Sequence, residues 1–175
     1  MFTLEFTVMN NTIRNISILM LVFMNTGCDQ ISKHAARQNI GYYETIDVIG
    51  KHLILTRIEN SGAFLSTGDS LEGSVKFFFL SLLPLVVLCY GIYYLLSNKD
   101  LSRLLVSGMC FVIGGGFGNL YDRLRYGSVT DFLHIDLYAF KTGIFNFADV
   151  SIMAGMIMIL INLYFKRTTT ELAEE

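Results

Sequence analysis

The run FFFLSLLPLVVLCYGIYYLL at residues 77–96 contains no charged side chain over 20 positions. A helix of about 20 apolar residues is long enough to cross the hydrocarbon core of a bilayer. Two further apolar runs lie between this one and the C-terminus, and a shorter run before it is interrupted by Asn25 and Asp29. The pattern predicts a multi-pass membrane protein whose helices span the bilayer at about 14–31, 75–97, 102–121 and 145–166.

The composition of the whole chain agrees with this class. Of its 175 residues, 53% are hydrophobic, and its 13 lysines and arginines are scattered, with a formal net charge of -2. Proteins that bind nucleic acid gather basic residues on one face, so we expect no nucleic-acid partner. The 3 cysteines lie in apolar runs and match no zinc-ligand spacing. Asp131, His134 and Asp136 would fall on both faces of a strand, so we expect neither a metal ion nor another cofactor.

Four spans place both termini on the same side of the membrane. The short connection at 97–103 carries Lys99 and Arg103, and Lys166 and Arg167 follow the last span. Basic residues beside spans favour the cytoplasmic side, so we expect cytoplasmic termini. The two extracytoplasmic loops then lie at about 32–74 and 122–144 of a single domain, 1–175.

Each of the two outer loops contains a predicted strand. Residues 52–59 (HLILTRIE) are rich in β-branched and leucine side chains and end in the turn-like Asn60-Ser61-Gly62. Residues 128–137 alternate, and Asp131 is the only charge on the apolar face. We therefore expect an all-α membrane protein of four transmembrane helices with a small extracytoplasmic β-structure.

Asp149 lies near the start of the last span, where an ionisable side chain is costly and therefore indicates a functional site. It follows Asn146 by three residues, so the alternative is a helix N-terminus that Asn146 caps and Asp149 stabilises through the helix dipole. Asp131 has its own alternative role as a turn carboxylate, although the alternation places it on the apolar face. If the two aspartates meet, burial and mutual repulsion raise one pKa, and the pair can share a proton and hydrolyse an amide.

The segment GGGFGNLYDR at 114–123 closes the third span. Gly114 and Gly118 form the small-xxx-small pattern typical of closely packed helices. Asn119, Asp122 and Arg123 follow on one helical face. An amide at this depth needs a hydrogen-bond partner, whereas an interfacial arginine often only extends toward the headgroups. Helix packing therefore explains the glycines, and the asparagine is the stronger indication of a site.

The outer end of the first span carries two further features. Asp29 and Lys33 are four residues apart, the spacing of an ion pair on one helical face, and we expect them to support the structure. The segment NTGCD at 25–29 looks like a lipobox, the lipid-attachment signal of lipoproteins. Asn25 stands where an aliphatic residue is expected, and three spans follow, so we do not expect this chain to be a lipoprotein itself.

Taken together, five motifs resemble those of the lipoprotein signal peptidase family, also called signal peptidase II. They occur in the family's order along almost the whole chain, and each sits at the expected place relative to the four spans. The motifs are DQISK (29–33), NSGAF (60–64), GGGFGNLYDR (114–123), VTDF (129–132) and FNFADV (145–150).

The resemblance implies a fold and a set of roles. It implies a four-helix membrane fold whose extracytoplasmic β-cradle holds the substrate, and it makes Asp131 and Asp149 the catalytic pair. The residues expected to bind or orient the substrate and the pair are Asn60, Gly62, Asn119, Arg123 and Asn146. Structural support is expected from Asp29, Lys33 and Asp122.

The resemblance also implies a substrate and a location. The substrates would be prolipoproteins that already carry diacylglycerol, cut just before the lipidated cysteine. The enzyme would be a monomer in the bacterial inner membrane, in contact with membrane lipid, with its active site near the periplasmic face. Inhibition by globomycin-type cyclic peptides would be expected.

Two other classes of function remain open from the residues alone. A small transporter or channel component could use Asp131 and Asp149 to relay protons or bind a cation. A membrane assembly factor without catalytic activity could use Gly114 and Gly118 to dock partner helices. Asparagine variants of the two aspartates separate these alternatives from a peptidase.

Overall fold

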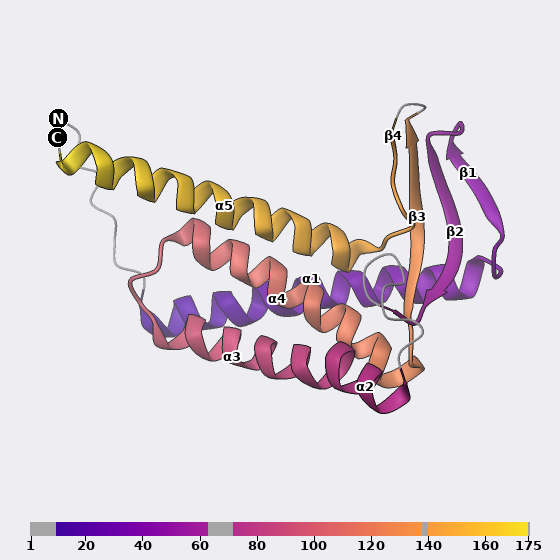
Figure 1. The fold of residues 1–175 in the computed structure, drawn as a ribbon, viewed down its shortest axis with the longest axis horizontal. Coiled ribbons are helices and arrows are strands. Elements are labelled where there is room, and N and C mark those ends of the chain that lie inside the picture. Colours follow the sequence, from indigo (N-terminus) through magenta and orange to yellow (C-terminus); the bar gives the residue numbers. More distant parts are fainter. Residues whose placement is uncertain (1–9, 63–71, 138–139, 175) are drawn as a thin grey trace.

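The computed structural model describes residues 10–62, 72–137 and 140–174, which form a bundle of long helices with a small sheet at one end (Figure 1). The second long helix is built of three consecutive segments, one of them a π-helical turn, η2. The helical elements are α1 (Asn11–Asn39), α2 (Gly73–Phe77), η2 (Phe78–Leu82), α3 (Leu83–Ser97), α4 (Arg103–Tyr126) and α5 (Phe147–Glu174).

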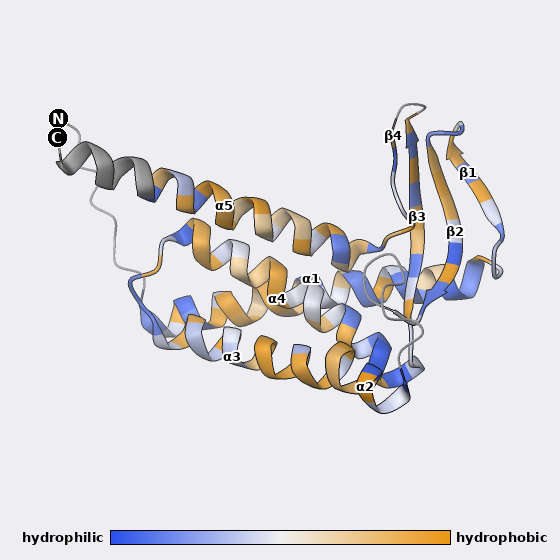
Figure 2. Cartoon of the chain, in the orientation of Figure 1, coloured by the Kyte–Doolittle hydropathy of each residue, from blue (hydrophilic) through white to orange (hydrophobic). Residues whose placement is uncertain are grey.

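Three helices are long and apolar enough to cross a membrane: Gly73–Ser97, Arg103–Tyr126 and Phe147–Lys166. They overlap three of the four predicted spans, those at about 75–97, 102–121 and 145–166. The hydropathy colouring shows apolar residues along α3 and the membrane-length part of α5 (Figure 2). The chain is thus mostly helical and has the composition of a membrane protein.

The first and last helices are longer than predicted. Helix α1 continues past residue 31 to Asn39, and α5 continues past 166 to Glu174. The predicted spans cover only the apolar lengths, whereas a helix stops where its backbone is interrupted, and neither extension contains Gly or Pro. Part of the predicted first outer loop is therefore helical. Helix α4 ends where Gly127 adopts a left-handed conformation with φ 75°.

Helix α4 lies in the middle of the bundle because its glycines admit the backbones of its neighbours. A Cβ atom at Gly114 would lie 2.9 Å from the carbonyl oxygen of Val22 in α1. On an adjacent face of α4, a Cβ atom at Gly115 would collide with the carbonyl oxygen of Ala148 in α5. The predicted role of Gly114 in close packing is confirmed.

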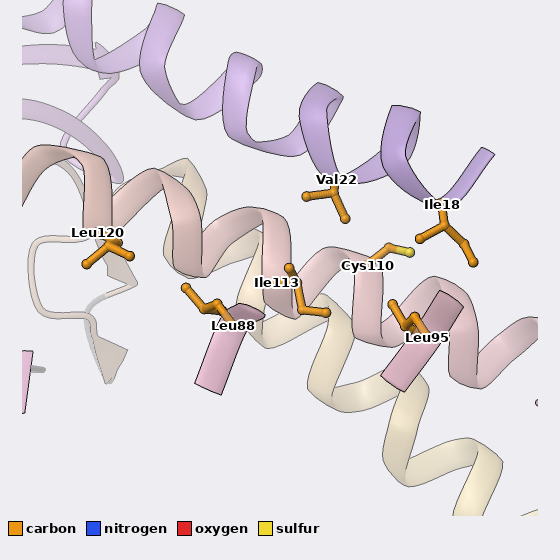
Figure 3. Packing of buried hydrophobic residues seen from close by; sticks show 7 residues of the cluster. All are labelled: Ile18, Val22, Leu88, Leu95, Cys110, Ile113 and Leu120. Carbon is orange, nitrogen blue, oxygen red and sulfur yellow. The ribbon is translucent and has the colours of Figure 1, made fainter. Parts of the chain in front are cut away.

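The main apolar cluster joins three helices on the side of α4 that faces α1 and α3 (Figure 3). Cys110, Leu95 and Leu120 are almost completely buried in it. The buried members of the cluster are Ile18 and Val22 of α1, Leu88 and Leu95 of α3, and Cys110, Ile113 and Leu120 of α4.

An antiparallel sheet of order β1-β2-β3-β4 stands at the end of the bundle opposite the start of α1 and the end of α5 (Figure 1). The two predicted strands are its central pair, and the short edge strands were not predicted. The strands are β1 (Thr45–Ile49), β2 (Leu53–Asn60), β3 (Val129–Leu137) and β4 (Phe140–Lys141). In the β2–β3 register Ile58 faces Asp131 and Asn60 faces Val129. This register brings the end of β2 beside the first half of β3.

Candidate active site

Asp131 and Asp149 line one cavity of about 750 Å³, which lies where the sheet meets the bundle. Asp131 belongs to β3, and Asp149 belongs to the first turn of α5. Three other predicted site residues, Asn60, Asn119 and Arg123, line the same cavity. Residues from four separate elements therefore converge on one space.

Both carboxylate oxygens of Asp131 accept hydrogen bonds from amide side chains. Oδ1 accepts from Asn146 Nδ2 at 2.6 Å, and Oδ2 accepts from Asn60 Nδ2 at 3.2 Å. The predicted turn after β2 is present, because the backbone N–H of Gly62 donates to Asn60 Oδ1 at 3.1 Å. That bond occupies the amide oxygen and leaves Nδ2 of Asn60 to face Asp131.

Asp149 both caps its helix and faces the cavity. Its Oδ2 accepts from the backbone N–H of Asn146 at 3.1 Å, while Asn146 Oδ1 accepts from the backbone N–H of Asp149 at 3.0 Å. This reciprocal pair satisfies two N–H groups at the start of α5, as in a capping box. The other oxygen, Oδ1, accepts from Asn119 Nδ2 at 3.0 Å. The capping role and the cavity position therefore occur together.

Asn146 and Asn119 join the two carboxyls. Asn146 is fully buried, and its Nδ2 donates to Asn119 Oδ1 at 3.2 Å as well as to Asp131. Asn146 therefore bonds Asp131 and Asn119, and Asn119 bonds Asp149, so the two amides connect the two carboxyls.

The electrostatic surroundings suit a shared proton. Burial and the nearby negative charge of Asp149 together raise the pKa of Asp131 to about 6, although the bonds from Asn146 and Asn60 act in the opposite direction. A carboxyl with this pKa exchanges its proton close to neutral pH, which is the range that general acid–base catalysis requires.

Arg123 is directed into the protein and does not simply extend to the membrane surface. Its Nη2 donates to the carbonyl oxygen of Gly62 at 3.1 Å. The bond ties the end of α4 to the turn that carries Asn60. Arg123 therefore lines the cavity, and Gly62, which is not among the lining residues, is tied to it through this bond.

Behind the cavity, α1 and α4 share a buried ion cluster. Lys33 Nζ lies 2.8 Å from Asp29 and 3.4 Å from Asp122, and all three side chains are 0% exposed. The predicted pairing of Asp29 with Lys33 is thus present. Asp29 Oδ1 also accepts from the backbone N–H of Ala148 at 2.9 Å, which connects the cluster to the start of α5.

Some residues around the site were not singled out from the sequence. Arg37 pairs with Asp122 at 3.4 Å and donates to Thr130 Oγ1 at 2.8 Å. It lies four residues after Lys33, so helical spacing could have identified it. An apolar stripe of α5 also lines the cavity, and its members follow its first residue, Val150, at the three- and four-residue intervals that mark one helical face. The stripe consists of Val150, Met153, Ala154 and Ile157.

Metal-ligating side chains do not gather at the site. Over residues 10–62, 72–137 and 140–174, no three His, Cys, Asp or Glu side chains converge as they would around a metal ion. The chemistry available in this part of the protein is that of two carboxyls, three amides and a guanidinium.

The chain is similar in sequence to known proteins over most of its length. The sequence profile of the family described as Signal peptidase (SPase) II matches residues 18–165. The chain is 39% identical to the lipoprotein signal peptidase of Enterococcus faecalis over 78% of its own length and 81% of that protein. It is 33% identical to the lipoprotein signal peptidase of Moorella thermoacetica, over 81% and 88% of the two chains.

Two solved structures share the fold. Both are described as bacterial membrane enzymes determined by the in meso method. One has a TM-score of 0.77 at 24% identity over 87% of this chain and 90% of its own. The other has a TM-score of 0.72 at 25% identity over 84% and 92%. The likeness in sequence spans the helices, the strands and every motif around the cavity, and on that basis the chain belongs to the signal peptidase II family.

Proposed function

We propose that this chain is an aspartic endopeptidase that removes the signal peptide from diacylglyceryl-modified prolipoproteins, cutting just before the lipidated cysteine. Membership of the family indicates cleavage of lipoprotein signal peptides. The observation that supports the aspartic mechanism is the convergence of Asp131 and Asp149 on one cavity, joined through buried amides.

In the proposed reaction the pair holds one proton, and Asp131 carries it at rest because its pKa is raised. Ionised Asp149 removes a proton from water as the water oxygen attacks the scissile carbonyl carbon. Asp131 donates its proton to the carbonyl oxygen, which gives a tetrahedral diol. As the C–N bond breaks, Asp149 passes its proton to the leaving nitrogen and Asp131 recovers one from the diol. Every proton is returned, so the pair is ready for another cycle.

The surrounding amides serve this cycle by holding the carboxyls in place. Asn60 and Asn146 each direct an N–H to Asp131, and Asn119 directs one to Asp149. Positioning of this kind lowers the entropic part of the barrier. Arg123 and Gly62 would form the wall against which the substrate backbone lies.

The placement of α1 favours a fourth span. Its polar residues Asp29 and Lys33 are fully buried, whereas Phe23 and Ile31 are 75% and 73% exposed. A helix that is polar inside and apolar outside fits a lipid environment, although its mean hydropathy is lowered by the buried charges. We therefore include α1 as the fourth transmembrane helix.

Four spans set the orientation that we propose. The start of α1 and the end of α5 lie at the end of the bundle opposite the sheet (Figure 1), and that end carries the basic residues Arg14, Lys99, Arg103 and Lys166. By the positive-inside rule it faces the cytoplasm. The cavity then lies near the periplasmic face of the inner membrane, where the acyl chains of a diacylated precursor would hold the scissile bond.

The cavity also suits a lipid-anchored substrate in its polarity. Its wall along α5 is apolar from Val150 to Ile157, so it continues from the aspartates toward the hydrocarbon region. Because one chain contributes both carboxyls, a monomer suffices for activity. Globomycin-type cyclic peptides should compete for the same cavity.

The test is cleavage of a synthetic diacylated lipobox precursor by purified protein in detergent. Asp131→Asn and Asp149→Asn should each lower kcat by about 10³-fold or more while remaining folded. Asp47→Asn, which changes an exposed carboxylate on β1, is the matched control and should cleave normally. Substantial cleavage by either active-site variant would exclude that residue from the mechanism, and a loss of ion flux with intact cleavage would favour a transporter.

A further inference from the structure

We propose that Lys33 is a positioning residue for the aspartate pair, because its ammonium group sets the orientation of the Asn119 amide that holds Asp149. The inference rests on the proposed function and goes beyond support of the first helix. Lys33 itself does not line the cavity.

The orientation of Asn119 follows from the chemistry of its neighbours. Lys33 Nζ donates to Asn119 Oδ1 at 2.8 Å. An ammonium group has three donors and no acceptor, so only the oxygen of the amide can face it. The NH₂ group of Asn119 must then point the other way, where it donates to Asp149 Oδ1 at 3.0 Å. A flipped amide would place two donors together and an amide oxygen against a carboxylate.

The same amide oxygen extends the effect to the second aspartate. Asn119 Oδ1 also accepts from Asn146 Nδ2 at 3.2 Å, and that nitrogen donates to Asp131 Oδ1 at 2.6 Å. Asn146 cannot flip freely either, because its oxygen accepts from the backbone N–H of Asp149. A chain of directed hydrogen bonds thus runs from Lys33 to both carboxyls.

Two carboxylates flank the fully buried side chain of Lys33. Asp29 and Asp122 lie 2.8 and 3.4 Å from its nitrogen. Gly118 makes room for this arrangement, because a Cβ atom there would collide with the carboxylate of Asp29. Two carboxylates balance the ammonium group, and its remaining hydrogen bond is directed toward the site.

The electrostatic effect of Lys33 has a definite sign. Burial raises the pKa of Asp131, and the charge of Lys33 acts in the opposite direction. Among the residues that the structure describes, the other charged groups around this region are Asp29 and Arg37 of α1, Glu59 of β2, Asp122 and Arg123 of α4, Lys141 of β4, and Asp149 of α5. Removal of the Lys33 charge should therefore favour the protonated form of Asp131 to a higher pH.

Lys33→Met alone would leave Asp29 and Asp122 facing each other in the core, so the pair is better removed as a unit. The test compares the double variant Asp29→Asn/Lys33→Met with Asp29→Asn alone. The single variant keeps Lys33, and its asparagine oxygen can still accept from the N–H of Ala148. Both are assayed for cleavage of the diacylated precursor across pH, with helix content followed by circular dichroism.

In the double variant, kcat should fall by about ten- to a hundredfold relative to Asp29→Asn, as expected for misplaced reacting groups, with KM little changed. The alkaline limb of its kcat/KM profile should move to higher pH, whereas Asp29→Asn should not move the limb upward. In an Asn119→Ala background, the additional loss of kcat on removing Lys33 should largely disappear, because the amide transmits it.

Equal kcat values and the same alkaline limb in the single and double variants would show that Lys33 only supports the helices, and the inference would be overturned. The inference would also be overturned if removing Lys33 lowered kcat by the same factor in the Asn119→Ala background as it does when Asn119 is present. Asp131→Asn and Asp149→Asn, measured in parallel, separate this failure from failure of the proposed function, since active aspartate variants would refute the mechanism itself.

Discussion

Replacing Asp131 with Asn should make the protein inactive and also more stable at neutral pH. Asp131 is 5% exposed, and burial together with the negative charge of Asp149 raises its pKa from an ordinary value of 3.8 to about 6. The folded protein therefore binds the proton of this carboxyl more tightly than the unfolded chain does. Ionisation of Asp131 therefore lowers the free energy of unfolding of the wild type, and an asparagine, which cannot ionise, avoids this loss.

The size of the effect follows from the pKa. A rise from 3.8 to about 6 corresponds to about 3 kcal/mol in favour of the protonated form. An asparagine would direct its NH₂ group at Asn60 Nδ2, the present donor to Asp131, and the mismatch should cost about 1 kcal/mol. The net gain is then about 2 kcal/mol, or about 4–8 °C in Tm for a chain of this length.

The direction of the pKa shift also determines the pH range over which the stability of the wild type changes. Because the folded-state pKa lies above the unfolded one, the wild type should lose stability as pH rises from about 4 to about 6. Thermal unfolding of both proteins in detergent, followed by far-ultraviolet circular dichroism at pH 4 and pH 8, measures the difference. The gain should be present at pH 8 and nearly absent at pH 4.

Asp47→Asn again provides the control, since its exposed carboxylate should change Tm at neither pH. The reasoning would be refuted if Asp131→Asn unfolded at a lower temperature than the wild type at pH 8. It would also be refuted if the two proteins kept a constant difference in Tm across this range.

Three further predictions follow from other features. Because the pair loses its shared proton as Asp131 ionises, kcat/KM should fall above about pH 6. The fall in kcat should come at a higher pH, because bound substrate excludes water from the site. Profiles of both constants against pH with the diacylated precursor test this, and a rise of kcat/KM through this range would contradict the assignment. Gly114→Ala should destabilise the protein by about 1–3 kcal/mol in thermal unfolding, because its Cβ would lie 2.9 Å from a carbonyl oxygen of α1. The control Gly27→Ala, whose Cβ would have nothing within 4 Å, should be neutral or stabilising. Arg14→Gln should lower stability by about 1–3 kcal/mol without changing kcat, because Arg14 donates to two backbone carbonyls at the end of α3, far from the cavity; a specific loss of kcat would show that this end communicates with the site.

Much of the fold could be predicted because the relevant signals are local. The charge-free run at 77–96 and the alternation at 128–137 predicted a membrane helix and a strand that the structure contains. The short strands β1 and β4 were missed, since their residues pair with neighbours and carry little periodicity of their own. Helices α1 and α5 continue beyond the predicted spans because hydropathy reports where lipid begins, whereas backbone hydrogen bonding decides where a helix stops.

The residues of the candidate site could also be predicted in part, but their contacts could not. Asp149 and Asn146 could be identified from their spacing, yet the spacing alone did not separate a helix cap from a site, and in the folded protein the same carboxylate does both. Asp131 could be recognised as an unusual charge on an apolar strand face. Neither observation indicated which amide would reach which oxygen.

The amino-acid sequence by itself was sufficient to assign the membrane class, three of the helical spans, the central strands and the family, because apolar length, alternation and motif order are properties of neighbouring residues. The hydrogen-bond partners of the aspartates, the inward direction of the polar face of α1 and the link from Lys33 to the site emerged only from the folded chain. The physical reason is distance along the chain: Lys33 and Asn119 lie 86 residues apart, and Asn60 and Asp131 lie 71 apart. Contacts of that kind depend on how helices and strands pack, which no local pattern specifies.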